Sequence, residues 1–378
     1  MAKLEEYMTV GQSRLRCGYT TGTCAAAAAR GAAELLLRGT LPPSVRIETP
    51  AGIVVEADLL EPKTGENWAS CGVIKDGGDD PDVTDGAMIF VTVRRTETEG
   101  VTVDGGLGVG RVTKPGLDQP VGAAAINRVP REMIARQLAQ ALSGETGGLS
   151  AVVSVPDGEK LAGRTFNPRL GIVGGISILG TGGIVRPMSE DAIVQSMKLE
   201  FSLVAATGAK DVLVTPGNYG EDFSREVLGL SLDKWALCSN YIGEAIDCAV
   251  GLGFETMLLV GHLGKLCKVA SGAMNTHSRV ADGRAETLCA HTALCGGSRE
   301  LIEQIFREPA TDGGVELLQQ AGLLENVMAS IAHSLDEKLK HRAGEKLRIE
   351  ALFFSNRFGI LGQTDGAAEL LKLHRLKG

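Results

Sequence analysis

The chain has 378 residues, which exceeds the usual size of one domain, so two domains are expected. Hydrophobic residues make up 44% and charged residues 22%, as in ordinary globular proteins, whereas 50 glycines indicate many tight turns and close backbone approaches. The net charge of −8 disfavours nucleic acid as a partner, because nucleic-acid-binding proteins carry a basic surface.

The first 148 residues alternate between helices and short strands. A helix is predicted over 25–38, with Thr23 as its N-cap and Gly39 closing its C-terminus. Strands separated by Pro and Gly follow, as in a small mixed or antiparallel sheet; they cover 45–47, 52–55, 73–74 and 88–93. A second helix is predicted over 130–142, and the Gly-rich stretch 143–148 is predicted to be a linker. Residues 1–148 are therefore expected to form an α+β domain.

Residues 149–378 repeat strand, loop and helix. Strands are predicted over 151–155, 212–214, 254–260 and 347–354, and helices over 189–207, 240–250, most of 284–341 and 366–376. This order predicts an α/β protein whose C-terminal domain is a Rossmann-like parallel sheet covered on both faces. Ligands of such sheets bind beyond the carboxyl ends of the strands, where the loops 215–220 and 261–265 lie.

The cysteines and the N-terminus indicate a cytoplasmic protein. Eight cysteines are too few for a disulfide framework in a chain of this length, and none forms a Cys-x-x-Cys pair. The first 16 residues lack the apolar segment of a signal peptide. The longest uncharged stretch, 170–185, is too short and too rich in glycine to span a membrane.

The same stretch, LGIVGGISILGTGGIV, is the first candidate for a ligand-binding loop, because six glycines can expose backbone N–H groups to a cofactor. The alternative is a strand with bulges and a tight turn. Together with the strand-end loop 215–220, it supplies the candidate cofactor-binding residues Gly174, Gly175, Gly180, Thr181, Gly182, Thr215, Gly217 and Asn218.

The segment 104–110, DGGLGVG, is similar to the glycine motif of Rossmann-type methyltransferases. That motif opens into a helix, but Pro115 and Gly116 follow closely here, so a turn between strands is favoured. A phosphate-binding P-loop is also disfavoured, because Gly264-Lys265 is followed by Leu266 and not by Ser or Thr.

The segment 75–85 holds five aspartates. Grouped carboxylates raise one another's pKa, which suits a general base, and Asp79, Asp80 and Asp82 are the candidates. Such a group is also able to hold a hard cation, and the alternative to both is a solvated acidic turn.

Polar side chains also stand where predicted helices begin and strands end. Thr20, Thr21 and Thr23 stand at the head of the first helix, where hydroxyls and N–H groups bind anions, or where they only cap the helix. His262, at a strand end, is a candidate proton shuttle or orienting donor, or a solvated histidine. Cys289, His291 and Cys295 have poor zinc spacing, so no protein metal site is expected.

Seven segments in a fixed order resemble the CbiD family, the cobalt-precorrin-5B C(1)-methyltransferases of cobalamin biosynthesis. They are GYTTGTCAAAAA (18–29), KDGGDDPDVTDGA (75–87), GLGVGRVTKPGL (106–117), INRVPREMI (126–134), NPRLGIVGGISILGTGGIVRPMS (167–189), SNYIGEA (239–245) and VGHLGKLCKVASGAMNTHSRVAD (260–282). The chain departs from the family pattern at Asp85, where histidine is usual, and at Gly182, where a second threonine is usual.

The resemblance implies transfer of a methyl group from S-adenosylmethionine to C-1 of cobalt-precorrin-5B, giving cobalt-precorrin-6A. The cobalt is part of the substrate. Methyl transfer requires positioning of the two reactants, and a ring proton must leave, for which an aspartate of 75–85 is a reasonable base. The implied substrate carries many carboxylates, which hydroxyl and cationic side chains are suited to bind. The candidate substrate-binding residues are Thr20, Thr21, Thr23, Arg111, Lys114, Arg169 and Lys265.

Two other functions are compatible with parts of the sequence. A nicotinamide-dependent corrin-precursor reductase suits a parallel sheet, but the chain lacks the Gly-x-Gly-x-x-Gly fingerprint. A non-catalytic corrinoid carrier needs no methyl donor. A homo-oligomer and transient contact with other cobalamin-pathway enzymes are left open by the sequence.

Overall fold

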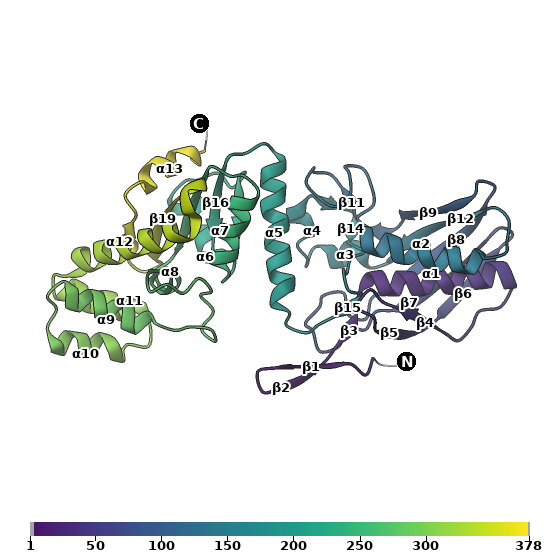
Figure 1. Ribbon diagram of the computed structural model, residues 1–378, viewed down its shortest axis with the longest axis horizontal. Helices are drawn as coiled ribbons and strands as arrows, with labels where there is room; N and C mark the ends of the chain where they lie inside the picture. Colours follow the sequence, from purple (N-terminus) through teal and green to yellow (C-terminus); the bar gives the residue numbers. More distant parts are fainter. Residues whose placement is uncertain (1–3, 377–378) are drawn as a thin grey trace. The chain divides into compact units, whose positions relative to one another are not determined.

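The computed structural model describes residues 4–376 and divides the chain into two units, residues 1–189 and 190–378 (Figure 1). The division lies later than the expected boundary at residue 148. Strand β12 (Gly148–Ser154) pairs on one side with β8 (Met88–Thr96) and on the other with β9 (Gly100–Gly105). Residues 143–148 are therefore a connection within the first unit, because the strand that follows them lies inside its sheet.

The first unit is built on a five-stranded sheet in the order β6-β7-β8-β12-β9. Strands β6 (Leu60–Gly65) and β7 (Trp68–Ile74) complete it, and only the β12–β9 pair is parallel. Helices α1 (Thr21–Arg38) and α2 (Arg128–Leu142) lie side by side against it (Figure 1). The five alanines of 25–29 are fully buried, and their small side chains let α1 pack closely.

Short paired strands surround this sheet and carry the loops singled out in the sequence. They are the pairs β1 (Tyr7–Val10) with β2 (Ser13–Arg16), β3 (Gly18–Tyr19) with β15 (Ile184–Val185), β4 (Ser44–Glu48) with β5 (Val54–Asp58), β10 (Gly108–Val109) with β14 (Gly175–Ile176), and β11 (Arg111–Val112) with β13 (Ile172–Val173). Two short helices, α3 (Gly158–Ala162) and α4 (Asn167–Leu170), connect β12 to β13.

Helix α1 begins earlier than expected. Thr20 is its N-cap, because the Thr20 side chain accepts a hydrogen bond from the backbone N–H of Thr23 at 3.3 Å. Thr23 therefore lies inside the first turn and is not the cap. The C-terminal prediction is confirmed, since Gly39 adopts a left-handed conformation with φ of 71°.

The second unit confirms the expected parallel sheet. Its order is β17-β16-β18-β19-β20, and the first four strands are parallel. The four parallel strands are β16 (Asp211–Thr215), β17 (Trp235–Leu237), β18 (Thr256–His262) and β19 (Arg348–Ser355). The fifth strand, β20 (Gly359–Gln363), is antiparallel to β19. Successive residues of β18 belong to opposite apolar clusters, with Leu259 in one and Leu258 in the other. Both faces of the sheet are therefore buried, as a doubly covered sheet requires.

The helices of the second unit pack on this sheet or on other helices of the unit. They are α5 (Glu190–Ala206), α6 (Asn218–Asp222), α7 (Ile242–Gly251), α8 (Leu263–Ala270), α9 (Arg284–Leu294), α10 (Arg299–Arg307), α11 (Thr311–Gln320), α12 (Leu324–Ala343) and α13 (Ala367–Leu373), with a π-helical turn over 223–227. Of these, α9 packs on α8 and α12, α11 on α9 and α12, and α10 on α9 and α11. Within residues 4–376, no helix combines the length and the apolar character needed to cross a membrane.

Candidate functional site

Three loops that stand far apart in the sequence meet in the first unit. The backbone N–H of Tyr19 donates to the carbonyl oxygen of Asp76 at 2.9 Å, which joins the head of α1 to the acidic segment. The N–H of Thr20 donates to Gly183 O at 3.0 Å, which joins it to the glycine segment. The candidate residues of 18–24, 75–85 and 177–188 are therefore brought together, and the partners of each side chain decide what remains open to a ligand.

The threonine hydroxyls at the head of α1 hold the glycine segment in place. Thr23 Oγ1 donates to Gly183 O at 2.7 Å, and Thr21 Oγ1 accepts from the N–H of Leu179 at 2.9 Å. All three threonines, Thr20 included, are buried. They were expected to bind substrate, but their hydroxyls have partners inside the protein, so their observed role is to cap α1 and fasten a loop to it.

Two glycines of 170–185, Gly175 and Gly180, allow close packing. Gly175 pairs with Gly108 in the parallel β10–β14 contact, where a Cβ on Gly175 would overlap the carbonyl group of Gly108. Gly180 has φ of 127° and packs directly on the Thr20 side chain. The segment forms short strands and turns, which agrees with the structural alternative raised for it. Gly174 and Thr181, by contrast, are exposed.

Gly182 has room for a side chain. A Cβ at this position would lie 3.7 Å from the Ala51 Cβ, an ordinary van der Waals distance, and φ at Gly182 is not in the left-handed region. We expect Gly182→Thr to change the free energy of unfolding by no more than about 0.5 kcal/mol, as for a surface substitution without a packing conflict. Urea denaturation measures this. A loss above about 2 kcal/mol would show that the surrounding loop is more tightly packed than the contacts indicate.

The acidic segment contains a buried ion pair. Lys75 is 2% exposed, and its Nζ lies 2.6 Å from Asp82 Oδ2. Thr84 also donates to Asp82, from its backbone N–H at 2.7 Å and its hydroxyl at 2.6 Å. Burial alone would raise the pKa of Asp82, but the charge of Lys75 and these hydrogen bonds lower it overall. The expected upward shift from grouped carboxylates is therefore wrong for Asp82, and its role as the base of the reaction stays a prediction.

The other aspartates of the segment bind neighbouring backbone groups. Asp79 Oδ2 accepts from the N–H of Arg16 at 2.7 Å, and Asp80 Oδ1 accepts from the N–H of Met188 at 2.9 Å. Asp85 Oδ1 accepts from the N–H of Gly77 at 2.7 Å. These aspartates thus bind different partners and do not converge on one point. Their hydrogen bonds fix the acidic segment as a turn against its neighbours.

The segment 104–110 is a turn between strands, as favoured from the sequence, since β9 leads into β10 and β11. Arg111 Nη1 donates to Asp104 Oδ1 at 2.8 Å, and this hydrogen bond lowers the pKa of Asp104. The guanidinium of Arg111, a candidate substrate ligand, is therefore engaged at an exposed ion pair. The exposed candidates Lys114 and Arg169 lie on the surface of the first unit near Gly171 and at the end of α4, respectively.

The second unit has a cavity of about 610 Å³ beyond the carboxyl ends of β16, β18 and β19. We call it the strand-end pocket. Its position is the one at which open parallel sheets bind ligands. It is lined by Tyr219, Asn240, His262, Gly264, Lys265, Lys268, Thr276, His277, Ser278, Arg284, Ala310, Thr311, Asp312 and Asn356.

His262 caps a helix at this pocket. Its Nδ1 accepts from the N–H of Gly264 at 3.1 Å, so the neutral ring carries its proton on Nε2. Burial lowers the pKa of His262, against the opposing charge of Asp312, and this favours the neutral form. Its N-cap bond occupies the basic nitrogen. Of the two roles expected for His262, the geometry suits the orienting donor and not the proton shuttle.

Two lysines hold the loops around the pocket. Lys265 Nζ donates to Pro216 O and lies 3.4 Å from Ser239 O, and burial lowers its pKa. Lys268 is 4% exposed and donates to the carbonyl oxygens of Thr276 and Ala281, both at 3.1 Å. These contacts fix the 215–220 and 276–281 loops. Lys265 thus borders a pocket, as expected of a ligand residue, while its ammonium is already bound by carbonyls.

The expected cofactor residues fall into both units. Gly174, Gly175, Gly180, Thr181 and Gly182 belong to the first unit, and Thr215, Gly217 and Asn218 to the second. Thr215 is fully buried, and its hydroxyl accepts from Trp235 Nε1 at 3.0 Å. Gly217 and Asn218 lead directly into the pocket residue Tyr219. Only the 215–220 loop therefore lies at the strand-end pocket.

Two residues of the pocket, Asp312 and Asn356, are not among those predicted from the sequence. Asp312 Oδ1 is buried, and within residues 4–376 it has no hydrogen-bond partner. Asn356 follows β19 directly, so the rule that ligands bind at strand ends would have identified it. Asp312 stands in the second position of α11, next to the pocket residues Ala310 and Thr311 but far along the chain from His262. No local pattern marks it, and only the tertiary structure brings it to His262.

Comparisons with known proteins agree with one family over nearly the whole chain. A family model described as CbiD matches residues 8–187, and one described as CbiD, C-terminal domain, matches residues 275–365. The cobalt-precorrin-5B C(1)-methyltransferase of Ruminiclostridium cellulolyticum is 47% identical over 376 residues, covering 98% of each chain. The protein of the same name from a Thermoanaerobacter species is 43% identical, covering 97% of this chain and all of its own.

A solved structure is also similar. It is described as a cobalamin biosynthesis protein (cbiD) from Archaeoglobus fulgidus, is 29% identical and covers 74% of this chain and 87% of its own, with a TM-score of 0.39.

Proposed function

The chain belongs to the CbiD family and methylates C-1 of cobalt-precorrin-5B in cobalamin biosynthesis, and we propose that S-adenosylmethionine is the methyl donor and binds in the strand-end pocket. The observation that carries the location is the buried, unpaired Oδ1 of Asp312 at this pocket within the described chain. A buried carboxylate oxygen without a donor is costly, so such an atom indicates a ligand that supplies one.

The residues of the pocket fit this donor. S-adenosylmethionine has an ammonium group and ribose hydroxyls, which donate hydrogen bonds, and it supplies a methyl group on a positively charged sulfur. Asp312 provides a negative charge and an open acceptor, while Asn240 and Asn356 provide amides. Its volume of about 610 Å³ lies within the usual range for cofactor sites. A pocket built for an anion alone would instead present unpaired cations, whereas its two lysines are already held by carbonyl oxygens.

The fixed loops of the pocket give it a preformed shape. Lys265 ties the 215–220 loop to α8, and Lys268 ties 276–281 to the same helix. His262 presents its Nε2–H as a donor because Gly264 occupies Nδ1. Methyl transfer depends on holding the donor in one orientation, so rigid walls and few mobile polar groups suit this reaction.

The proposal predicts a specific loss of donor binding when Asp312 loses its charge. We expect Asp312→Asn to weaken the binding of S-adenosylhomocysteine about tenfold, since a hydrogen bond to a charged group contributes roughly 1.5–3 kcal/mol. Isothermal titration calorimetry measures this. The matched control is Glu316→Gln. Glu316 lies on the same helix, but its carboxylate pairs with Arg357 outside the pocket. Equal affinities of Asp312→Asn and the parent chain would overturn this location.

A further inference from the structure

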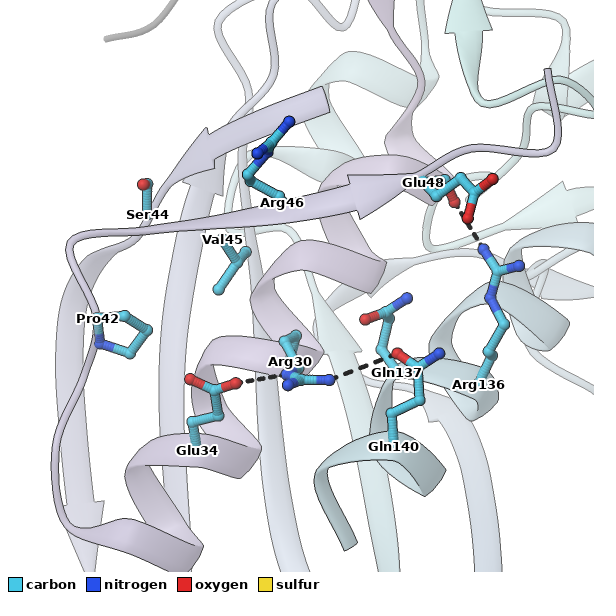
Figure 2. A pocket seen from close by; sticks show the side chains of 10 residues that line it. All are labelled: Arg30, Glu34, Pro42, Ser44, Val45, Arg46, Glu48, Arg136, Gln137 and Gln140. Atoms are coloured by element: carbon cyan, nitrogen blue, oxygen red, sulfur yellow. Dashed lines mark hydrogen bonds and ion pairs between the residues drawn. The ribbon is translucent and has the colours of Figure 1, made fainter. Parts of the chain in front are cut away.

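A second cavity, of about 470 Å³, lies in the first unit between α1, α2 and β4 (Figure 2). We call it the arginine pocket. Arg30 enters from α1, whereas Arg136, Gln137 and Gln140 enter from α2. Positions three and four apart on a helix share a face, so the two glutamines and Arg136 are presented together.

The two arginines of this pocket are fixed but keep donors in reserve. Arg30 Nε donates to Glu34 Oε1 at 2.5 Å, and its Nη1 lies 3.5 Å from Gln140 Oε1. Arg136 Nη2 donates to the backbone oxygen of Glu48 at 2.6 Å. A guanidinium has five N–H donors. Each arginine is therefore held by a few bonds in one orientation while other N–H groups are left for a ligand.

One residue that lines this cavity, Gln137, is largely buried, unlike the residues of an ordinary surface depression. Gln137 is 5% exposed as a whole residue, and its amide atoms are open to the cavity, not sealed inside the protein. Figure 2 shows this amide beside Gln140 and above the guanidinium of Arg30. A polar amide that is held at a cavity wall by an otherwise buried side chain is a preformed hydrogen-bonding group for a polar ligand that enters the cavity.

The charges around the pocket select the class of that partner. Arg30 and Arg136 oppose one carboxylate, Glu34, which leaves one positive charge. Arg46 and Glu48, on the outward face of β4, balance each other. A single carboxylate matches this balance, whereas a phosphate dianion exceeds it. Planar guanidinium groups also match a carboxylate geometrically.

We propose that the arginine pocket binds one carboxylate side arm of the corrinoid substrate, with Arg30, Arg136 and Gln137 as its donors. The identity of the ligand rests on the proposed function, whereas the carboxylate chemistry rests on the pocket alone. A site of this kind anchors the ring by a peripheral group away from the reacting carbon. Binding energy from such a group holds the substrate without taking part in the methyl transfer.

Kinetics with cobalt-precorrin-5B test the proposal. We expect Arg136→Met and Gln137→Glu each to raise KM for the corrinoid about tenfold at an unchanged kcat, because an anchor is lost equally from ground state and transition state. Gln137→Glu keeps the shape of the side chain and adds a charge that repels a carboxylate. The control is Arg38→Met, which removes an exposed arginine at the far end of α1.

Direct binding separates this proposal from the one on the methyl donor. Uroporphyrin III, a tetrapyrrole polycarboxylate, is expected to bind the two variants about tenfold more weakly than the parent chain, while S-adenosylhomocysteine binds all of them equally. If both variants bind uroporphyrin III and the corrinoid as tightly as the parent chain does, the arginine pocket is not the carboxylate site. Stronger competition by inorganic phosphate than by propionate would overturn the choice of a carboxylate. A parent chain that fails to bind S-adenosylhomocysteine would overturn only the proposed methyl donor.

Discussion

Replacement of Asp82 by alanine is expected to lower the free energy of unfolding of the first unit by about 3–5 kcal/mol, the usual cost of leaving a buried charge without its partner. Lys75 Nζ would lose the carboxylate that lies 2.6 Å from it, while its side chain is only 1% exposed. Urea denaturation followed by Trp68 fluorescence in a Trp235→Phe background measures this. Trp68 lies on β7, the strand that ends beside Lys75.

The double variant Lys75→Met, Asp82→Ala is the control, because it removes both charges and leaves no buried ion. It should recover a large part of the lost stability. A single variant as stable as the parent chain would show that Lys75 reaches another partner. If the activity of the folded double variant also matches the parent, Asp82 is not the base of the reaction.

The same ion pair predicts a dependence of stability on pH. The pKa of Asp82 in the folded chain is lowered from its ordinary value near 3.8. Its contribution is therefore complete above that ordinary value and is lost as the pH falls through it toward the folded value. Between about pH 5 and pH 3 the parent chain should lose stability more steeply than Asp82→Ala. Parallel curves would contradict the lowered pKa.

Replacement of Gly175 by alanine is expected to lower the free energy of unfolding by about 3 kcal/mol, at the upper end of the usual cost of overpacking. The added Cβ would overlap the carbonyl group of Gly108, and neither backbone can move aside without breaking the β10–β14 pair. The same fluorescence measurement detects the change.

The neighbouring Gly174 provides a matched control. It has φ of 84° but open space around a Cβ, so Gly174→Ala should cost only about 1 kcal/mol of left-handed strain. Gly175 has no left-handed φ, so a loss at 175 no larger than that at 174 would show that the contact with Gly108 is relieved at little cost. Together the pair measures how much the contact with Gly108 contributes to the stability of this segment.

The candidate site divides into what local patterns predict and what they cannot. Gly217 and His262 were identified because they follow predicted strands, and the structure places them beside or in the strand-end pocket. Asp82 and Thr23 were identified by residue type and spacing alone. Their partners, Lys75 and Gly183 O, use the same hydrogen-bonding capacity that a ligand would need. Chemical type predicts what a group can bind, but not which neighbour binds it first.

Hydrophobic spacing, helix ends and ordered motifs are local properties of the chain, so the main helices and strands, the parallel sheet of the second half and the family could be predicted from residues alone. The division at residue 189, the hydrogen bonds of the aspartates and threonines, and the position of Asp312 could not. Each depends on contacts between segments far apart in sequence. Such contacts form when strands pair and helices pack, and no short stretch of residues records them.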